Sequence, residues 1–250
     1  MNVRLVDSMP RENGDAAIVQ AARVSYGEGT KTINEDKGLI RYLMRHWHTT
    51  PFEMVAFKFH LRMPMFVARQ WLRHRTASVN EVSARYSLVR DDYWIPDEFR
   101  VQSKTNHQGS GEAFKNENLR KEVCEHCVTG FKLYNKLIDE GVSRELARCH
   151  LPQSTYTEFY WTINLHNLLH FLELRMDSHA QQEIQEYACQ VFELIKPIVP
   201  LTCDAFLDYR VGRIVLSRVE IDAIRNGQKE ILGKGENQEF QEKRKLLGLE

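Results

Sequence analysis

The segment from Arg69 to Arg90 carries the side chains best suited to chemistry. It holds five arginines against one glutamate, a local net charge of +4 in a chain whose total charge is zero. Arginine presents a planar fork of donors that matches the geometry of a phosphate group. One charge-assisted hydrogen bond contributes about 1.5–3 kcal/mol, whereas micromolar affinity needs about 8 kcal/mol. Several converging arginines therefore predict a site for a phosphorylated ligand.

Short polar side chains are interleaved with these arginines and suit the rest of such a ligand. Neighbouring serines offer hydroxyl groups, and the amide of Gln70 matches the polar edge of a heterocyclic base. Pro64 suits the first position of a helix, which we expect to reach Arg73 or Arg75. That helix would place Gln70, Arg73 and His74 on one face.

Two other interpretations of the arginines stay open on composition alone. The segment also fits a solvated basic face that pairs with acids elsewhere, or a nucleic-acid-binding module. Such a module needs a broad basic surface with stacking aromatic side chains. Lysine plus arginine and aspartate plus glutamate balance here at 34 each. We therefore expect no nucleic-acid partner.

The spacing within this segment forms a motif. Arg73-His74-Arg75, seven further residues and then Ser83 resemble the RHR-x7-S motif of the flavin-dependent thymidylate synthases. The resemblance covers most of residues 1–220 and is weak in residues 100–120 and after about residue 225. The other stretches that carry it are His48–Glu53, Asn80 and Glu81, Arg85 and Tyr86, Ala147–Pro152, and Asn164–Gln181.

The resemblance implies an activity and its reactants. Members of this family methylate the uracil ring of dUMP to make dTMP, with methylenetetrahydrofolate as the carbon donor. They bind FAD, deliver hydride from the reduced flavin, and use NADPH to reduce it. The resemblance also implies a homotetramer whose active sites are shared between subunits, with Arg148 serving a neighbour's site.

The resemblance assigns site residues in two sets. The residues expected to contact FAD are Thr50, Arg73, His74, Arg75, Glu81, Asn164, Leu165, His166 and His170. The residues expected to contact dUMP are Gln70, Arg73, Glu81, Ser83, Ala84, Arg85, Arg148 and Arg175.

Arg175 is the best candidate for a catalytic residue. It follows Asn164 by eleven residues, about 16 Å along a helix, so one helix can span a flavin and a nucleotide. A guanidinium stays charged near pH 7 and cannot act as a base. We therefore expect Arg175 to stabilise negative charge on N3 and O4 of uracil, which makes C5 more nucleophilic.

Other catalytic chemistries have weaker support. Ser83 has no activating base that the sequence reveals, so substrate binding suits it better than nucleophilic attack. The chain has no Pro-Cys dipeptide, which the conventional thymidylate synthases use for nucleophilic attack. Cys124 and Cys127 form only half of a zinc site. The remaining histidine cluster lacks an HExxH pattern, so we expect no metal and no metal-dependent hydrolase. That cluster comprises His166, His170 and His179.

The composition places the chain among ordinary globular proteins, with 42% hydrophobic and 27% charged residues. Five irregularly spaced cysteines do not resemble a secreted disulfide framework. The first 20 residues lack the apolar core of a signal peptide, and no apolar run approaches the roughly 18 residues of a membrane span. We expect a cytoplasmic protein without a membrane partner.

The elements that must position the site are mixed in order. Residues 53–63 alternate between apolar and polar side chains, which predicts a half-buried antiparallel strand. Further strands are expected at residues 2–6 and 154–160. Helices are expected at residues 15–24 with Asp15 as cap, from Asn34 to Pro51, and at 114–140, 143–149, 162–177 and 179–196, the last stopped by Pro197 and Pro200.

This order of elements predicts the fold class. Strands and helices alternate without βαβ regularity, which favours an α+β fold with a largely antiparallel central sheet flanked by helices. We expect one domain over residues 1–225, forming a single-domain subunit of a homotetramer. Residues 76–92 are expected to be mostly loop, 100–120 an exposed insertion, and 226–250 a charged tail that frays.

Overall fold

The computed structural model describes residues 2–24, 33–103 and 109–249. The chain divides into two compact units, the first ending at Phe206 and the second beginning at Leu207. The expected domain boundary at residues 225 and 226 lies within the second unit. Among the helices of the described residues, none has both the length and the apolar character needed to cross a membrane.

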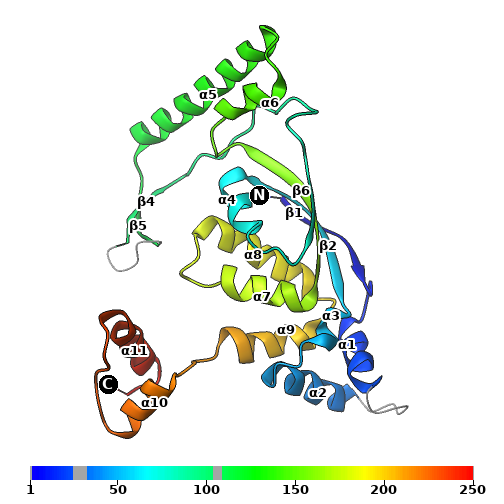
Figure 1. The fold of residues 1–250 in the computed structure, drawn as a ribbon, viewed down its shortest axis with the longest axis vertical. Helices are drawn as coiled ribbons and strands as arrows, with labels where there is room; N and C mark the ends of the chain where they lie inside the picture. Colours follow the sequence, from blue (N-terminus) through cyan, green and yellow to red (C-terminus); the bar gives the residue numbers. More distant parts are fainter. Residues whose placement is uncertain (1, 25–32, 104–108, 250) are drawn as a thin grey trace. The chain divides into compact units, whose positions relative to one another are not determined.

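The first unit is built on a four-stranded antiparallel sheet (Figure 1). Its strands, in spatial order, are β1 (Asn2–Met9), β2 (Ala56–Pro64), β6 (Tyr156–Asn164) and β3 (Ser78–Glu81). Helices flank this sheet, so the predicted α+β class with an antiparallel sheet is confirmed.

The alternation that predicts β2 reflects burial of one face. Phe57, Phe59 and Leu61 are fully buried, while Lys58 between them is exposed. Phe59 pairs in register with Trp161 of β6, and their ring centroids lie 5.9 Å apart. This shared aromatic face forms the core against which the site helices pack.

Three helices cover that face of the sheet: α4 (Met65–Trp71), α7 (Leu165–Arg175) and α8 (Gln182–Ile195). Trp71 of α4 packs against Trp161 of β6 and Phe171 of α7, with ring centroids 5.1 and 4.3 Å away. The hydroxyl of Tyr187 in α8 donates a hydrogen bond to the carbonyl of Arg62, at 2.9 Å. These contacts fix α4 and α7 relative to each other.

Four further helices of the first unit pack together: α1 (Gly14–Arg23), α2 (Ile33–Arg45), α3 (Thr50–Glu53) and α9 (Pro200–Phe206). The prediction that Asp15 caps its own helix is wrong, because Asn13 holds that position. The Asp15 carboxylate instead caps α9. It accepts hydrogen bonds from the backbone N–H of Leu201 at 2.7 Å and from both N–H and hydroxyl of Thr202.

Two predicted boundaries set by single residues are also wrong, and a third is only partly right. Helix α2 begins at Ile33, so Asn34 lies inside it, and it ends at Arg45 without a proline. Pro51 lies within the first turn of α3, where its missing N–H costs nothing. Helix α8 ends at Ile195, just before Pro197, as predicted, whereas Pro200 does not end a helix but begins α9.

The segment beyond β3 forms a separate layer of the first unit. A two-stranded antiparallel sheet of β4 (Phe99–Gln102) and β5 (Ser110–Phe114) occupies much of the expected insertion, whose residues 104–108 lie outside the described residues. Helix α5 (Glu117–Asp139) follows, capped by the side chain of Asn116. The short helices α6 (Arg144–Ala147) and η2 (Arg148–His150) lead back to β6.

The structure corrects three of the predicted elements around the site. Helix α4 ends at Trp71, so Arg73 and His74 lie beyond it and share no helical face with Gln70. Residues 78–81, expected to be loop, form β3. Residues 162–164, expected to be helical, continue β6 because strand pairing with β2 reaches Asn164.

The second unit is helical. It contains the π-helical turn η3 (Leu207–Val211), α10 (Arg218–Arg225) and α11 (Lys234–Leu246). Ser217 and Glu220 form a capping box at the start of α10, and Lys243 of α11 binds the Glu220 carboxylate at 2.8 Å. Phe240 is fully buried. The prediction that this charged tail frays is therefore wrong.

Candidate active site

A cavity of about 690 Å³ lies between the segment that follows β3 and the segment that leads into β6. Its size suits a small-molecule ligand. Four of the residues predicted to bind dUMP line it: Glu81, Ser83, Ala84 and Arg148. Two arginines that the prediction did not include, Arg62 and Arg90, line it as well. The cavity thus combines three guanidinium groups and serine hydroxyls, which are suited to a phosphate, with the carboxylates of Glu81, Asp92 and Glu158.

Strand pairing positions the Glu81 side of this cavity. Glu81 ends β3 and pairs in register with Phe159 of β6. The N–H of Val82 then donates a hydrogen bond to the carbonyl of Glu158 at 2.9 Å. The buried hydroxyl of Thr157 donates a hydrogen bond to the Glu81 carboxylate. The backbone then turns, because the N–H of Tyr86 and that of Ser87 both bond to the carbonyl of Ser83. This turn directs the 83–87 segment into the cavity wall.

The sequence does not identify Arg62 as a site residue, because the alternation of β2 places it on the polar, solvent-facing side of the strand. That side forms part of the cavity wall. The Arg62 guanidinium lies over the Tyr156 ring, 4.3 Å from its centroid, and pairs with Asp92. No local sequence signal identifies this contact, since Asp92 lies 30 residues away.

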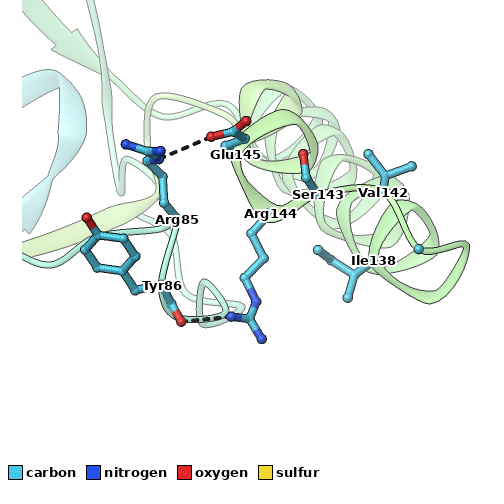
Figure 2. A pocket seen from close by; sticks show the side chains of 8 residues that line it. Arg85, Tyr86, Ile138, Val142, Ser143, Arg144 and Glu145 are labelled. Carbon is cyan, nitrogen blue, oxygen red and sulfur yellow. Dashed lines mark hydrogen bonds and ion pairs between the residues drawn. The ribbon is translucent and has the colours of Figure 1, made fainter.

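Arg85 lies apart from this cavity. Its guanidinium Nε lies 3.2 Å from the Glu145 carboxylate, and both side chains are about half exposed. Figure 2 shows this pair at the edge of a second, open cavity of about 480 Å³, which Tyr86 and Arg144 also line. Arg144 donates a hydrogen bond to the carbonyl of Tyr86 at 2.9 Å. These two contacts tie the 85–86 segment to α6.

A second group of predicted residues gathers at the end of α7. Arg175 Nε donates a hydrogen bond to His74 Nε2 at 3.0 Å. The His74 ring lies against Phe171 and His170, with centroids 4.9 and 6.2 Å away. The backbone N–H of His74 bonds to the carbonyl of Trp71, so a turn after α4 brings the ring to α7.

The electrostatics of this group fix its protonation states. Burial, together with the charge of Arg175 and the adjacent His170, lowers the pKa of His74 to about 4. His74 is therefore neutral near pH 7, and because Nε2 accepts from Arg175, its proton resides on Nδ1. Burial also lowers the pKa of Arg175, yet a guanidinium stays protonated in this range.

The start of α7 holds the remaining predicted flavin contacts. Asn164 caps the helix, its side-chain oxygen accepting from the N–H of Asn167 at 2.9 Å. Leu165 is fully buried and its N–H bonds to the carbonyl of Val55, so its side chain belongs to the core. His166 is half-buried on the first turn of α7, and Thr50 is exposed at the start of α3, which packs against α7.

The other members of the predicted set lie around the end of α4. Arg73 and Arg75 are exposed on either side of His74. Gln70 is half-buried and donates a hydrogen bond from Nε2 to the side-chain oxygen of Gln181, at 2.5 Å.

Apart from Arg85, which lies at the second cavity, the predicted dUMP residues fall into two groups within one chain. One group lines the 690 Å³ cavity, and none of its lining residues is Gln70, Arg73 or Arg175, all of which the structure describes. These three lie on or near α4 and α7.

The cysteine pair considered as half of a zinc site lies on α5, in the helix that the sequence predicts. The Cys127 thiol is buried and contacts the Ser154 hydroxyl at 3.4 Å. Within residues 2–24, 33–103 and 109–249, no group of three or more histidine, cysteine, aspartate or glutamate side chains is arranged to hold a metal ion.

Comparison with known proteins gives consistent matches over most of the chain. Residues 4–201 match the family model described as thymidylate synthase complementing protein. The flavin-dependent thymidylate synthase of Dictyostelium discoideum is 54% identical over 98% of this chain and 84% of its own length. That of a strain of Thermus thermophilus is 52% identical, over 89% of this chain and 82% of its own.

A solved structure agrees with these sequence matches. The UMP/dUMP methylase PolB from Streptomyces cacaoi, bound with 5-Br dUMP, superposes with a TM-score of 0.78 at 36% identity. The match covers 84% of this chain and 96% of that one. The same enzyme bound with 5-Br UMP gives a TM-score of 0.73. On the evidence of its fold, its motif and these relatives, this chain belongs to the family of flavin-dependent thymidylate synthases.

Proposed function

We propose that this protein methylates C5 of the uracil ring of dUMP to make dTMP. The carbon donor is methylenetetrahydrofolate, the bound flavin is FAD, and NADPH supplies the reducing equivalents. The observation that supports this most is the cavity lined by Glu81, Ser83, Ala84 and Arg148, because the second half of the segment Arg69–Arg90 also lines it. The relatives' names and the nucleotide analogues bound to PolB support the same substrate class.

The nucleotide phosphate binds to the cationic part of this cavity. Arg148 and Ser83 supply a charged and a neutral donor, and Arg90 adds a second positive charge. Two or three charge-assisted hydrogen bonds of about 1.5–3 kcal/mol each supply most of the affinity that a micromolar ligand needs. Glu81, held by Thr157, can accept from a sugar hydroxyl on the same ligand.

The active site is shared between subunits of a homotetramer. Support comes from the division of the predicted dUMP residues into a cavity group and an α4–α7 group within one chain. Joining the cavity of one subunit to Arg175 and Gln70 of another brings both groups to one nucleotide. Symmetric assemblies commonly build sites in this way from a repeated interface.

The residues around His74 fit a flavin dinucleotide. Arg73 and Arg75 are exposed cations suited to its diphosphate, and neutral His74 carries a donor at Nδ1. Thr50 and Asn164 add neutral polar groups near the start of α7. When bound, reduced flavin supplies the hydride. The side chains named here hold and orient it.

Arg175 provides the positive charge at the uracil ring. Its Nε is occupied by His74, which leaves the two terminal NH2 groups for the ligand. The guanidinium is half-buried, so its charge is less screened than it would be in water. It stabilises negative charge on N3 and O4 as the one-carbon unit bonds to C5. His74 keeps the guanidinium in the orientation that this requires.

The test is turnover by the purified protein. It should carry a flavin absorption band and convert dUMP to dTMP when given methylenetetrahydrofolate and NADPH, with the product identified by mass spectrometry. UMP is the matched control. Flavin-loaded protein that forms no dTMP, or that methylates UMP alone, would contradict the proposal, and colourless protein that retains RNA would favour nucleic-acid binding. A cytoplasmic location stays a prediction.

A further inference from the structure

A series of hydrogen bonds links Gln70 at the end of α4 to the hairpin strand β4. Gln70 Nε2 donates to Gln181 Oε1 at 2.5 Å, and Gln181 Nε2 donates to Glu183 Oε2 at 2.8 Å. The other oxygen of Glu183 accepts from Arg100 Nη2 at 2.5 Å. The four side chains come from α4, the start of α8 and β4 (Figure 1).

The carboxylate in this series is the most deeply buried of its members. The Glu183 side chain is 8% exposed and the Arg100 side chain 22%. A buried carboxylate is retained only when it is paired and hydrogen-bonded, and here each oxygen has its own donor. Arg100 is held in turn by a second bond, from Nη1 to Gln182 at 2.9 Å. The position of the carboxylate is thus fixed from both sides.

The carboxylate also sets the direction of every bond in the series. An ionised carboxylate only accepts, so Gln181 must turn its NH2 group toward Glu183. The side-chain oxygen of Gln181 then faces Gln70, and an oxygen there requires the NH2 group of Gln70. Gln70 is left with a free side-chain oxygen and one remaining N–H for a ligand. Without Glu183, both amides could rotate by 180° at little cost.

We propose that Glu183 is a positioning residue for nucleotide binding, which acts through Gln181 to fix the orientation of the Gln70 amide. Arg100 of the β4–β5 sheet holds Glu183 in place, which gives this part of the expected insertion a role in the site. The inference rests on the proposed function, because the contact between Gln70 and dUMP belongs to that proposal.

The test replaces Glu183 with its neutral isostere. In the flavin-loaded Glu183→Gln variant, the new amide can either donate to or accept from Gln181. It therefore no longer fixes the orientation of the Gln181 side-chain amide. The KM for dUMP should rise about tenfold, close to the loss of one hydrogen bond, while kcat at saturating dUMP changes less than about twofold. The matched control is Glu193→Gln, a change of the same type at an exposed position of α8 that should leave both constants unchanged.

A double-mutant cycle separates positioning from general loosening of the structure. Gln70→Ala should also raise the KM for dUMP about tenfold, and Glu183→Gln should add nothing further in that background. Additive effects, or an unchanged KM in either single variant, would overturn the inference. If Glu183→Gln does not fold, Gln181→Met breaks the same series and leaves the Arg100–Glu183 pair intact. The same rise in KM is then expected, and its absence would also overturn the inference.

Failure of this inference is distinguishable from failure of the proposed function. Wild-type protein that makes no dTMP would defeat the proposed function. Active wild-type protein together with a Glu183→Gln variant of normal KM would defeat only the positioning role.

Discussion

Arg175 donates a hydrogen bond from Nε to Nε2 of His74 at 3.0 Å, although 101 residues separate the two in the chain. The bond joins the end of α7 to the turn after α4, and both elements are fixed by the packing of Trp71 against Phe171. It requires a neutral His74 and leaves the terminal NH2 groups of Arg175 for a ligand. The motif histidine therefore orients Arg175, the residue that we propose to be catalytic.

His74 should stay neutral across the range in which exposed histidines titrate. Its pKa is lowered to about 4, mainly by burial, so NMR of labelled histidine should show no protonation of His74 between pH 8 and about 5. A titration midpoint near 6.5, the ordinary value, would contradict the assignment.

The same shift makes the stability of the fold depend on pH. Unfolded protein binds a proton at this residue from about pH 6.5 downward, whereas folded protein binds it only near pH 4. The free energy of unfolding should therefore fall as the pH decreases from 6.5 to 4. Chemical denaturation should show a smaller fall in His74→Gln, with His126→Gln as the matched control. An identical pH dependence in wild type and His74→Gln would contradict this.

Replacing Arg175 with alanine should cripple dTMP formation. Removing one preorganised donor from a site of developing negative charge typically costs about 100-fold to 1,000-fold in kcat. Binding of dUMP should weaken, while much of the FAD stays bound because other residues hold it. Steady-state kinetics and flavin absorbance check both. Near-normal turnover would refute the role of Arg175, and a His74 pKa that does not rise in this variant would refute its contact with His74.

Arg85 should contribute to dUMP binding once it leaves Glu145. We expect Arg85→Ala to raise the dissociation constant for dUMP at least tenfold, about 1.4 kcal/mol. Titration calorimetry on flavin-loaded protein measures this. Unchanged affinity would remove Arg85 from the phosphate site.

If Arg85 binds dUMP as proposed, we expect Glu145 to compete with the nucleotide for it. The pair is about half exposed, and such ion pairs contribute about 0.2–1 kcal/mol. Glu145→Gln should therefore tighten dUMP binding by up to about fivefold. A weaker complex in the same calorimetric experiment would show that the pair supports the site and does not compete with it.

Asp15 should stabilise the fold by capping α9. Its carboxylate accepts three hydrogen bonds from Leu201 and Thr202, so Asp15→Ala should lower the free energy of unfolding by about 2 kcal/mol. Denaturant unfolding measures the change, and Glu12→Ala, at an exposed position before α1, is the matched control. A loss no larger than that of the control would contradict the capping role.

The sequence predicts the features that depend on neighbours in the chain. The alternation of β2 follows from one buried face, and the RHR motif is recognisable because its residues are close in the chain. Features that depend on distant partners were missed. Every residue of β3 is exposed, so no apolar pattern indicates that it pairs with β6.

The same physical reason explains the other errors. Asp15 has the local appearance of a helix cap, yet its partners lie 186 residues away at Leu201 and 187 away at Thr202. The charged tail lacks an apolar run, yet Phe240 is buried and Lys243 reaches Glu220. Long-range contacts of single side chains leave no periodic signal in the sequence.

Complementation between two inactive variants tests the central claim most directly. Arg148→Ala removes one guanidinium from the cavity group, and Arg175→Ala removes one from the α4–α7 group. Each variant alone should therefore form almost no dTMP. Chains of the two variants, carrying different tags, are co-expressed, and mixed oligomers are purified through both tags. If one nucleotide contacts Arg148 of one subunit and Arg175 of another, dTMP formation should recover to about a quarter of the wild-type rate. Mixed oligomers that remain as inactive as the single variants would contradict a site assembled between subunits.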